Sequence, residues 1–405
     1  MCKVERIGLP APDNCLGCSA CVAACARGAL NLEQDERGFY RPSVDDGLCV
    51  GCGACSRACP VVGSPTSRRR PLKTMAAWDK DRGRRLAATS GGMFMLLADA
   101  FVSQGGWVCG AAMNENMIVE HIVSNDINVI VKMRGSKYVQ SRIDAALSDC
   151  LDLLKRGERV LFSGTSCQVD AMRRLARGRL SANLMTVDVL CHGAPSPRVW
   201  GDYVSYRERE AGSKAVSSRF RKKDPSWTVF SLEMLFENGD RRSWRTVDDY
   251  YLRAFLGDYI TQNACHSCPY TGTDRLSDIT LADFWGYVSE SRADRNTEDG
   301  ISLVLVNSDA GMGLLKSVDG VHLIDKELGE AVKGNPPLRT VFPANGRSDE
   351  FWADYEKGGF DSVLDEYLGP RASSKKHQLS LWFNDHAYIF PGPLRRALVS
   401  ARGGE

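Results

Sequence analysis

The sequence contains no run that approaches the roughly 20 consecutive apolar residues of a membrane-spanning helix. It also lacks an excess of charge, because 52 basic residues stand against 50 acidic ones. This balance gives no electrostatic reason to expect nucleic acid or an anionic membrane surface as a partner. Residues 1–13 include no apolar stretch long enough for a secretion signal. We therefore expect a cytoplasmic protein, and its 405 residues leave room for two or three domains.

Cysteine, in contrast, is abundant, with 15 residues in the chain. A reducing cytosol argues against a disulfide framework. Eight of the cysteines fall in two stretches, CLGCSACVAAC and CVGCGACSRACP, and each stretch follows the pattern CxxCxxCxxxC. Three closely spaced thiolates turn toward one small volume and the fourth turns toward another, so two such runs exchange their fourth ligands. The spacing predicts one 4Fe-4S cluster on Cys15, Cys18, Cys21 and Cys59, and a second on Cys25, Cys49, Cys52 and Cys55.

This repeat resembles the bacterial two-cluster ferredoxin module. One departure is Ala26, which stands where a proline usually follows the fourth cysteine. A pair of zinc sites is the alternative, although zinc favours two CxxC pairs separated by a longer gap. We expect residues 1–65 to form a ferredoxin-type domain that carries electrons, and the clusters to help hold so small a module together.

The chain changes character after this module. Residues 66–74 predict a linker rich in proline, serine and arginine. Strand-like and helix-like stretches then alternate through residues 75–369, which predicts an α+β or α/β fold with a mixed sheet. Expected strands are 75–79, 106–113, 117–124, 159–164, 184–191 and 279–286, and expected helices include 91–104 and 167–178. Residues 370–405 form a basic, aromatic tail, which would either dock on the body or a partner or extend from the surface.

Four further cysteines occur where ligands gather in open sheets. Cys167 and Cys191 each follow a predicted strand, and Cys265 with Cys268 form a CxxC before another. A third 4Fe-4S cluster on these four residues is our hypothesis. A lone cysteine at a strand end is usually a small buried hydrophobe, so that alternative stays open. The remaining thiols, which have no partner in the pattern, are assigned to packing or to the surface: Cys2, Cys109 and Cys150.

Several long phrases resemble one family. They are FSGTSCQVDAMRRL, VLCHGAPSPRVWGDY and CHSCPYTGTDRLSDITLADFWGY, preceded by the shorter SGG and GSKY. They are similar to motifs of the beta subunits of coenzyme F420 hydrogenases and dehydrogenases, and the resemblance covers roughly residues 75–369. It implies an iron-sulfur flavoprotein oxidoreductase, in which clusters pass electrons to FAD and FAD exchanges a hydride with a small-molecule acceptor. The implied partners are a ferredoxin or a dehydrogenase or hydrogenase subunit, and the implied acceptors include coenzyme F420.

The resemblance also implies where FAD binds. The candidate residues are Ser90, Gly91, Gly92, Gly135, Ser136, Lys137, Tyr138, Gly164, Thr165, Asp283, Trp285 and Gly286. Glycines that open a helix expose backbone N–H groups to a diphosphate, as residues 90–92 would, although a simple N-cap is the plainer interpretation. Trp285 is suited to stacking on a ring, and Asp283 to binding an N–H or a ribose hydroxyl. A buried aspartate paired for structural reasons is the alternative for Asp283.

Two other features fit the same chemistry less specifically. The cations of residues 219–227 would meet an anionic cofactor or acceptor, or would line a solvated strand edge. His192 and His266 stand beside cysteines and would serve as proton sources or as ordinary loop residues.

Two functions compete. One is a self-contained FAD-dependent reductase, in which no side chain acts as a nucleophile and no catalytic side chain is predicted. The other is a relay subunit of a larger complex without a substrate of its own. A third, a scaffold that has lost FAD, is disfavoured by the intact SGG, GSKY and DFWG phrases.

Overall fold

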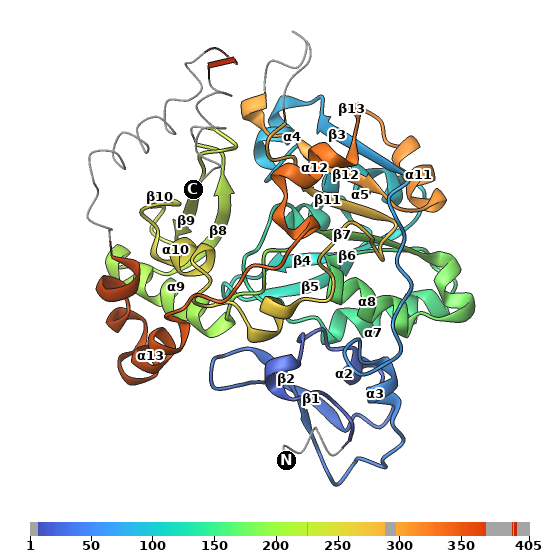
Figure 1. Ribbon diagram of the computed structural model, residues 1–405, viewed down its shortest axis with the longest axis horizontal. Coiled ribbons are helices and arrows are strands. Elements are labelled where there is room, and N and C mark those ends of the chain that lie inside the picture. The colour runs from blue at the N-terminus through green and yellow to red at the C-terminus, as the bar shows by residue number, and fades with distance from the viewer. Residues whose placement is uncertain (1–6, 225, 288–296, 370–390, 392, 395–405) are drawn as a thin grey trace.

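The computed structural model describes residues 7–224, 226–287, 297–369, 391 and 393–394. Figure 1 shows an N-terminal module below a large central sheet, and a smaller lobe beside that sheet. The predictions for Cys2 and for almost all of the tail, residues 370–405, lie outside the described residues.

The N-terminal module is built on a short antiparallel hairpin. Its elements are η1 (Pro12–Asn14), α2 (Ala20–Ala23), β1 (Leu30–Gln34), β2 (Tyr40–Val44) and α3 (Ala54–Ala58). Its buried core contains three aliphatic side chains, Leu9, Leu30 and Val44, and the rest of that core is cysteine. So few apolar groups cannot stabilise a domain alone, which agrees with the expectation that the clusters contribute to its folding.

The central sheet has eight strands in the order β13-β3-β12-β11-β7-β6-β4-β5. Their bounds are β3 (Lys73–Asp79), β4 (Trp107–Met113), β5 (Val119–Ser124), β6 (Val160–Thr165), β7 (Leu184–Val189), β11 (Ile279–Asp283), β12 (Ser302–Val306) and β13 (Val321–Lys326). The four middle strands, β4, β6, β7 and β11, run parallel, and the outer strands are antiparallel to their neighbours. This confirms the mixed α/β sheet, and all six predicted strands belong to it.

Helices cover both faces of this sheet, as parallel strands require. The longer ones are α5 (Met93–Ser103), α7 (Asp144–Lys155), α8 (Ser166–Leu175) and α11 (Asp309–Lys316). Apolar side chains of α5 and α11 form one buried cluster with the sheet, and those of α7 and α8 form another. Shorter helices and turns connect them: α4 (Arg82–Ala87), α6 (Ile127–Ile130), η2 (Val131–Met133), η3 (Gly178–Asn183), η4 (Asn263–Ser267), η6 (Thr297–Asp299), α12 (Leu328–Gly334) and η7 (Pro336–Leu338).

The side lobe has an aromatic core. Its sheet is β8 (Ala215–Lys222), β9 (Ser231–Phe236) and β10 (Arg241–Arg245), and its helices are α9 (Pro197–Ala211), α10 (Tyr250–Leu256), α13 (Ser348–Ser362) and the helical turn η8 (Leu364–Leu368). Trp200, Tyr203 and Tyr251 pack with ring centroids 5.0 to 5.7 Å apart. The sequence patterns did not single out this lobe.

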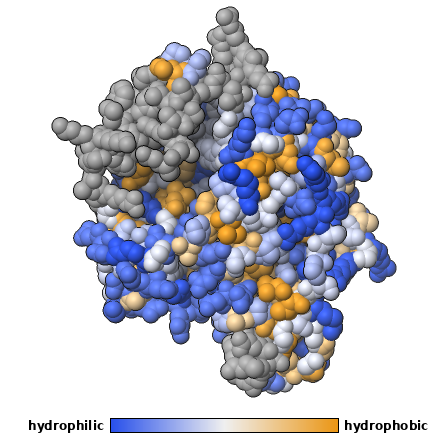
Figure 2. Space-filling model, in the orientation of Figure 1, coloured by the Kyte–Doolittle hydropathy of each residue, from blue (hydrophilic) through white to orange (hydrophobic). Residues whose placement is uncertain are grey.

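The segment predicted as a linker lies along the body. Thr66 Oγ1 donates to Asp170 Oδ1 at 2.6 Å, and Arg69 exchanges backbone hydrogen bonds with Arg275. β3 begins at Lys73, within the predicted linker. No helix among the described residues is long and apolar enough to cross a membrane. Figure 2 shows a largely hydrophilic face on which hydrophobic side chains gather over the N-terminal module at the lower end.

Candidate functional site

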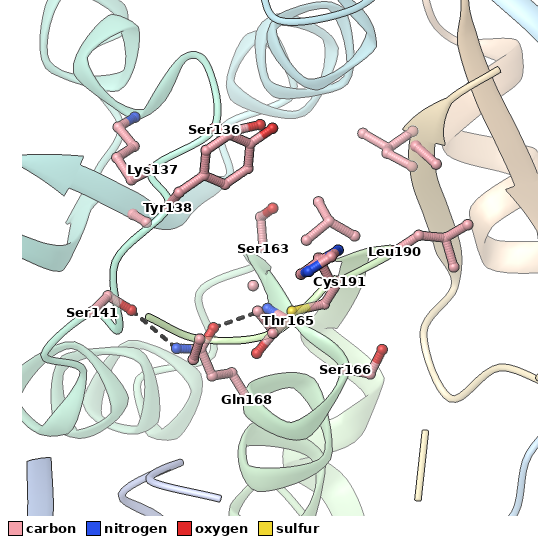
Figure 3. A pocket seen from close by; sticks show the side chains of 18 of the residues that line it. Ser136, Lys137, Tyr138, Ser141, Ser163, Thr165, Ser166, Gln168, Leu190 and Cys191 are labelled. Atoms are coloured by element: carbon pink, nitrogen blue, oxygen red, sulfur yellow. Dashed lines mark hydrogen bonds between the residues drawn. The ribbon is translucent and has the colours of Figure 1, made fainter. Parts of the chain in front are cut away.

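The candidate site is a cavity of about 340 Å³ at the carboxyl ends of the parallel strands. Residues that end β6, β7 and β11 line it, together with residues at the starts of α5 and α8 and the loop 134–141. Carboxyl ends of parallel strands are where ligands bind in open sheets. The volume falls within the range of about 300–1,000 Å³ of small-molecule and cofactor sites. Figure 3 shows side chains from several of these elements turned toward this space.

Most of the predicted flavin residues line this cavity. The nine that do are Ser90, Gly92, Gly135, Ser136, Lys137, Tyr138, Gly164, Thr165 and Asp283. The other three, which lie outside the lining, are Gly91, Trp285 and Gly286. Segments 90–92, 135–138, 164–165 and 283 are far apart in the chain, so the fold brings them together.

Gly91 serves packing rather than the cavity. A Cβ there would lie 2.3 Å from the carbonyl oxygen of Ala77 and 2.8 Å from the amide nitrogen of Ser302, so no side chain fits between β3 and β12. Its own N–H donates to Ser302 Oγ at 2.9 Å. Gly92, with φ of 95°, adopts a backbone that favours glycine and opens α5 at the cavity wall. The glycine pair therefore fixes where the amino end of α5 lies.

Trp285 is engaged by another aromatic ring. It stacks on Trp227 with ring centroids 4.9 Å apart and an interplanar angle of 1°. Asp283 accepts a hydrogen bond from Trp227 Nε1 at 2.6 Å and pairs with the buried Arg221. These contacts match the structural alternative for Asp283, although the residue lines the cavity.

A buried polar network, which the sequence did not indicate, lines the cavity floor. Gln168 Nε2 donates to Ser141 Oγ at 3.0 Å, and its Oε1 accepts from the Thr165 N–H at 2.9 Å (Figure 3). Ser141 Oγ lies 3.0 Å from His121 Nδ1, and His121 Nε2 lies 3.2 Å from the Ser163 carbonyl oxygen. Burial lowers the pKa of His121 to about 4, so its ring is neutral near pH 7. Gln168 also completes a capping box with Thr165, which orients the start of α8.

Two half-buried lysines stand around the cavity. Lys137 lines it and donates to the carbonyl oxygens of Lys132 and Arg134 at 2.9 and 3.1 Å. Burial, with a smaller effect of the Arg134 charge, lowers the pKa of Lys137 to about 7. Lys223 donates to three carbonyl oxygens, of which Ser90 O, at 2.5 Å, belongs to the cavity wall. Lys223 therefore fastens the segment that precedes α5.

The four cysteines of the third hypothesised cluster meet at this cavity, and all of them line it: Cys167, Cys191, Cys265 and Cys268. Burial, with smaller contributions from charges on Cys268 and Cys265, raises the pKa of the Cys167 thiol to about 12. Burial raises the pKa of Cys191 well above its usual value, and the other three cysteines add to the shift. Four mutually repelling thiolates need cations between them, which an iron cluster supplies. The donor set fits such a group.

The cysteines of the N-terminal module also interact in the predicted groups. After burial, charges on Cys15 and Cys59 are the next causes that raise the pKa of Cys21. In the second group, burial raises the pKa of Cys55, and charges on Cys25 and Cys52 contribute. Cys49 packs beside Cys25 and Cys55 in the same small core. Among the described residues, no three His, Cys, Asp or Glu side chains are arranged to hold a single metal ion.

The groups are close to one another. A charge on Cys167 is the largest cause, after burial, of the raised pKa of Cys18, and a charge on Cys55 contributes to that of Cys21. The contact between the module and α8 uses small residues, since Cys18, Ala20 and Ala58 pack on Ala171. The first group therefore lies between the second group and the third.

A hydrogen-bonded pair sits at this contact. Tyr270 Oη donates to Asp170 Oδ2 at 2.7 Å. Burial raises the pKa of the Tyr270 hydroxyl, and charges on Asp170, Cys167 and Cys18 add to the shift. Arg174 Nε donates to Asp170 Oδ1 at 2.9 Å. Tyr270 thus lies near the first and the third thiol groups.

The two histidines that follow cysteines have ordinary partners. His192 Nε2 lies 3.0 Å from Asp258 Oδ1, and its ring stacks on Phe342 with centroids 3.8 Å apart. His266 Nδ1 lies 2.9 Å from the carbonyl oxygen of Phe342. Both histidines therefore help to fix the segment around Phe342.

Comparisons with known proteins assign two segments of the chain. Residues 157–327 match the family of the C-terminal region of coenzyme F420 hydrogenase/dehydrogenase beta subunits, and residues 14–62 match the 4Fe-4S dicluster domain. A similar solved structure is the xenon-derivatised F420-reducing NiFe hydrogenase complex from Methanosarcina barkeri, with 18% identity, a TM-score of 0.46, and coverage of 76% of this chain and 97% of that one. No curated protein matches the sequence. The chain therefore carries a segment that matches the 4Fe-4S dicluster domain, followed by a segment that matches the C-terminal region of coenzyme F420 hydrogenase/dehydrogenase beta subunits.

Proposed function

We propose that this chain is an iron-sulfur flavoprotein oxidoreductase. It would hold three 4Fe-4S clusters on its three thiol groups and FAD in the cavity, and would exchange electrons between a redox partner and a small organic acceptor such as coenzyme F420. The partner would be a ferredoxin or a subunit of a dehydrogenase or hydrogenase. The observation that carries the proposal is the convergence of Cys167, Cys191, Cys265 and Cys268 on the cavity that nine predicted flavin residues line.

The arrangement suits a change from one-electron to two-electron chemistry. When bound, iron-sulfur clusters exchange single electrons, and FAD exchanges electrons singly or as a pair with hydride acceptors. The chain's own residues would bind and separate these groups. The second, first and third thiol groups form a series that ends at the cavity, which is the order that transfer between a surface partner and a buried site requires.

Residues around the cavity would bind the anionic and planar parts of FAD. The amino end of α5, opened by Gly92, presents backbone N–H groups and a partial positive charge that favour a diphosphate. Lys137, when protonated, would add a full charge, and the ring of Tyr138 an aromatic surface. The neutral His121, fixed by Ser141 and the Ser163 carbonyl oxygen, would hold the floor without adding charge.

Iron and flavin analysis of anaerobically purified protein would test the proposal. About twelve irons and one FAD per chain are expected, from three clusters of four irons. Cys191→Ser should lower the iron content by about four. Cys109→Ser is the matched control, because Cys109 is a buried cysteine that lies outside the three thiol groups. About eight irons with FAD would refute the third cluster alone, whereas clusters without flavin would favour a relay subunit.

A further inference from the structure

A second cavity, of about 790 Å³, lies at the opposite edge of the central sheet. Its lining includes Arg159, which directly precedes β6, and Leu184 and Met185, which begin β7. The second cavity therefore lies at the amino ends of these strands, and the first cavity lies at their carboxyl ends. Its lining shares no residue with that of the first cavity. One wall is the segment 64–66, which the dicluster domain does not include.

Five arginines line this space, and we call it the arginine cleft: Arg69, Arg159, Arg173, Arg174 and Arg177. Two have carboxylate partners, since Arg174 pairs with Asp170 at 2.9 Å and Arg173 lies 3.8 Å from Asp278. Within the described part of the chain, Arg69, Arg159 and Arg177 pair with no carboxylate. Arg159 instead stacks on Phe101 and donates to Gln104 at 3.4 Å.

The charge in the arginine cleft exceeds what the fold needs there. Asp278 and Asp309 also line it, and Asp170 stands behind Arg174, so five cations face three carboxylates with an excess of two positive charges. Arginines at the carboxyl end of a helix can offset its dipole, and α8 ends at Leu175, with Arg174 in its last turn and Arg177 just after it. That effect needs only about half a charge. The excess is therefore available to a ligand.

Guanidinium groups in a concave, polar site suit phosphate oxygens, which they bind in pairs of parallel hydrogen bonds. We propose that the arginine cleft binds a small phosphorylated anion of the diphosphate class, free or as part of a nucleotide. The volume fits a ligand of that size, since such sites span about 300–1,000 Å³. A concave cleft of this kind favours a small anion over the flat face of an acidic protein, which would need a broader surface. This proposal requires neither the iron clusters nor FAD.

The test is calorimetric titration of the flavin-replete, full-length protein at low salt with inorganic diphosphate, and in parallel with inorganic phosphate and ADP. The double variant Arg159→Gln with Arg177→Gln removes two charges whose side chains are exposed, so the fold is expected to persist. Diphosphate should bind the unchanged protein, and the double variant should bind it at least tenfold more weakly. Arg209→Gln is the matched control, because this exposed arginine pairs with Asp361 outside the cleft and its loss should leave binding unchanged.

The three ligands separate the possible sources of the phosphate. Equal affinity for diphosphate and ADP would indicate that only the phosphates are recognised, and tighter binding of ADP would add a nucleoside contact. No binding of diphosphate or ADP at millimolar concentration would overturn the proposal, as would equal binding by the double variant. A third outcome is that the unchanged protein binds an acidic ferredoxin in a salt-sensitive way, the double variant does not, and neither binds diphosphate. That result would make the cleft a protein contact and would also overturn the proposal. Iron and FAD contents of every variant should equal those of the unchanged protein, so failure here would not bear on the proposed cofactors.

Discussion

The buried pair of Arg275 and Asp188 provides the sharpest test of how the site is held. Their side chains are 3% and 0% exposed. Asp188 also accepts hydrogen bonds from Ser166 Oγ and Ser277 Oγ at 2.7 and 2.6 Å, and Arg275 donates to the carbonyl oxygen of Tyr270 at 2.9 Å. The pair thus ties the end of β7 to the start of α8, directly before Cys167. Removing the guanidinium would leave a buried carboxylate without its counter-charge.

Arg275→Gln should therefore destabilise the protein by about 3–5 kcal/mol, the usual cost of breaking a buried ion pair from one side. At about 1.4 kcal/mol for each factor of ten, the ratio of folded to unfolded protein falls by roughly 140- to 3,700-fold. Arg209→Gln, which breaks an exposed pair with Asp361, should cost about 0–1 kcal/mol. The difference comes from desolvation, because water solvates the exposed Asp361 but cannot reach Asp188.

Urea unfolding of the anaerobic holoprotein, followed by tryptophan fluorescence, would measure both losses as shifts of the midpoint at equal slope. A second arm replaces both partners, Arg275→Met with Asp188→Leu, and should recover part of the loss because no buried charge remains. A loss for Arg275→Gln no larger than for Arg209→Gln would refute the reasoning.

Two further predictions concern the cavity wall. Gly91→Ala should lower the unfolding midpoint and the FAD content, because its Cβ would lie 2.3 Å from a carbonyl oxygen. Gly201→Ala in α9, where nothing lies within 4 Å of the new Cβ, should instead raise the midpoint by the equivalent of about 1 kcal/mol. Equal effects of the two changes on the midpoint would contradict the packing argument. Lys137 has its pKa lowered to about 7 by burial and by Arg134, so its positive charge is present below that pH and lost above it. FAD affinity, measured by titration of the flavin-free protein between pH 6 and 8.5, should therefore fall as the pH rises through 7. His121, with a pKa of about 4, stays neutral over this range. Lys137→Gln should bind FAD more weakly at pH 6 and show a flatter pH profile, and a pH profile unchanged by this substitution would exclude Lys137 as the cause.

The sequence by itself determined the local features. The spacing of the eight N-terminal cysteines predicted the dicluster domain, because ligands within one short loop are directed by the loop itself. The six predicted strands were also found, since a buried parallel strand shows its apolar run in the sequence. The long motifs around Cys167, Cys191 and Cys265 indicated the family that the comparison of residues 157–327 supports.

Only the tertiary structure decided which distant residues meet. Cys167, Cys191 and the pair Cys265 and Cys268 share one cavity wall because β6, β7 and β11 run parallel and end at the same edge of the sheet. No local pattern predicts that strand order. The same holds for Trp285, which stacks on Trp227 from another segment and lies outside the cavity lining.

The arginine cleft follows the same rule. Its arginines stand in separate segments, which are the stretch before β3, the turn before β6, and the last turn of α8 with the residues that follow it. The chain as a whole has almost balanced charge. Composition averages over the sequence and therefore hides a local excess of charge. The fold creates that excess because the amino ends of β6 and β7 bring these segments to one edge of the sheet.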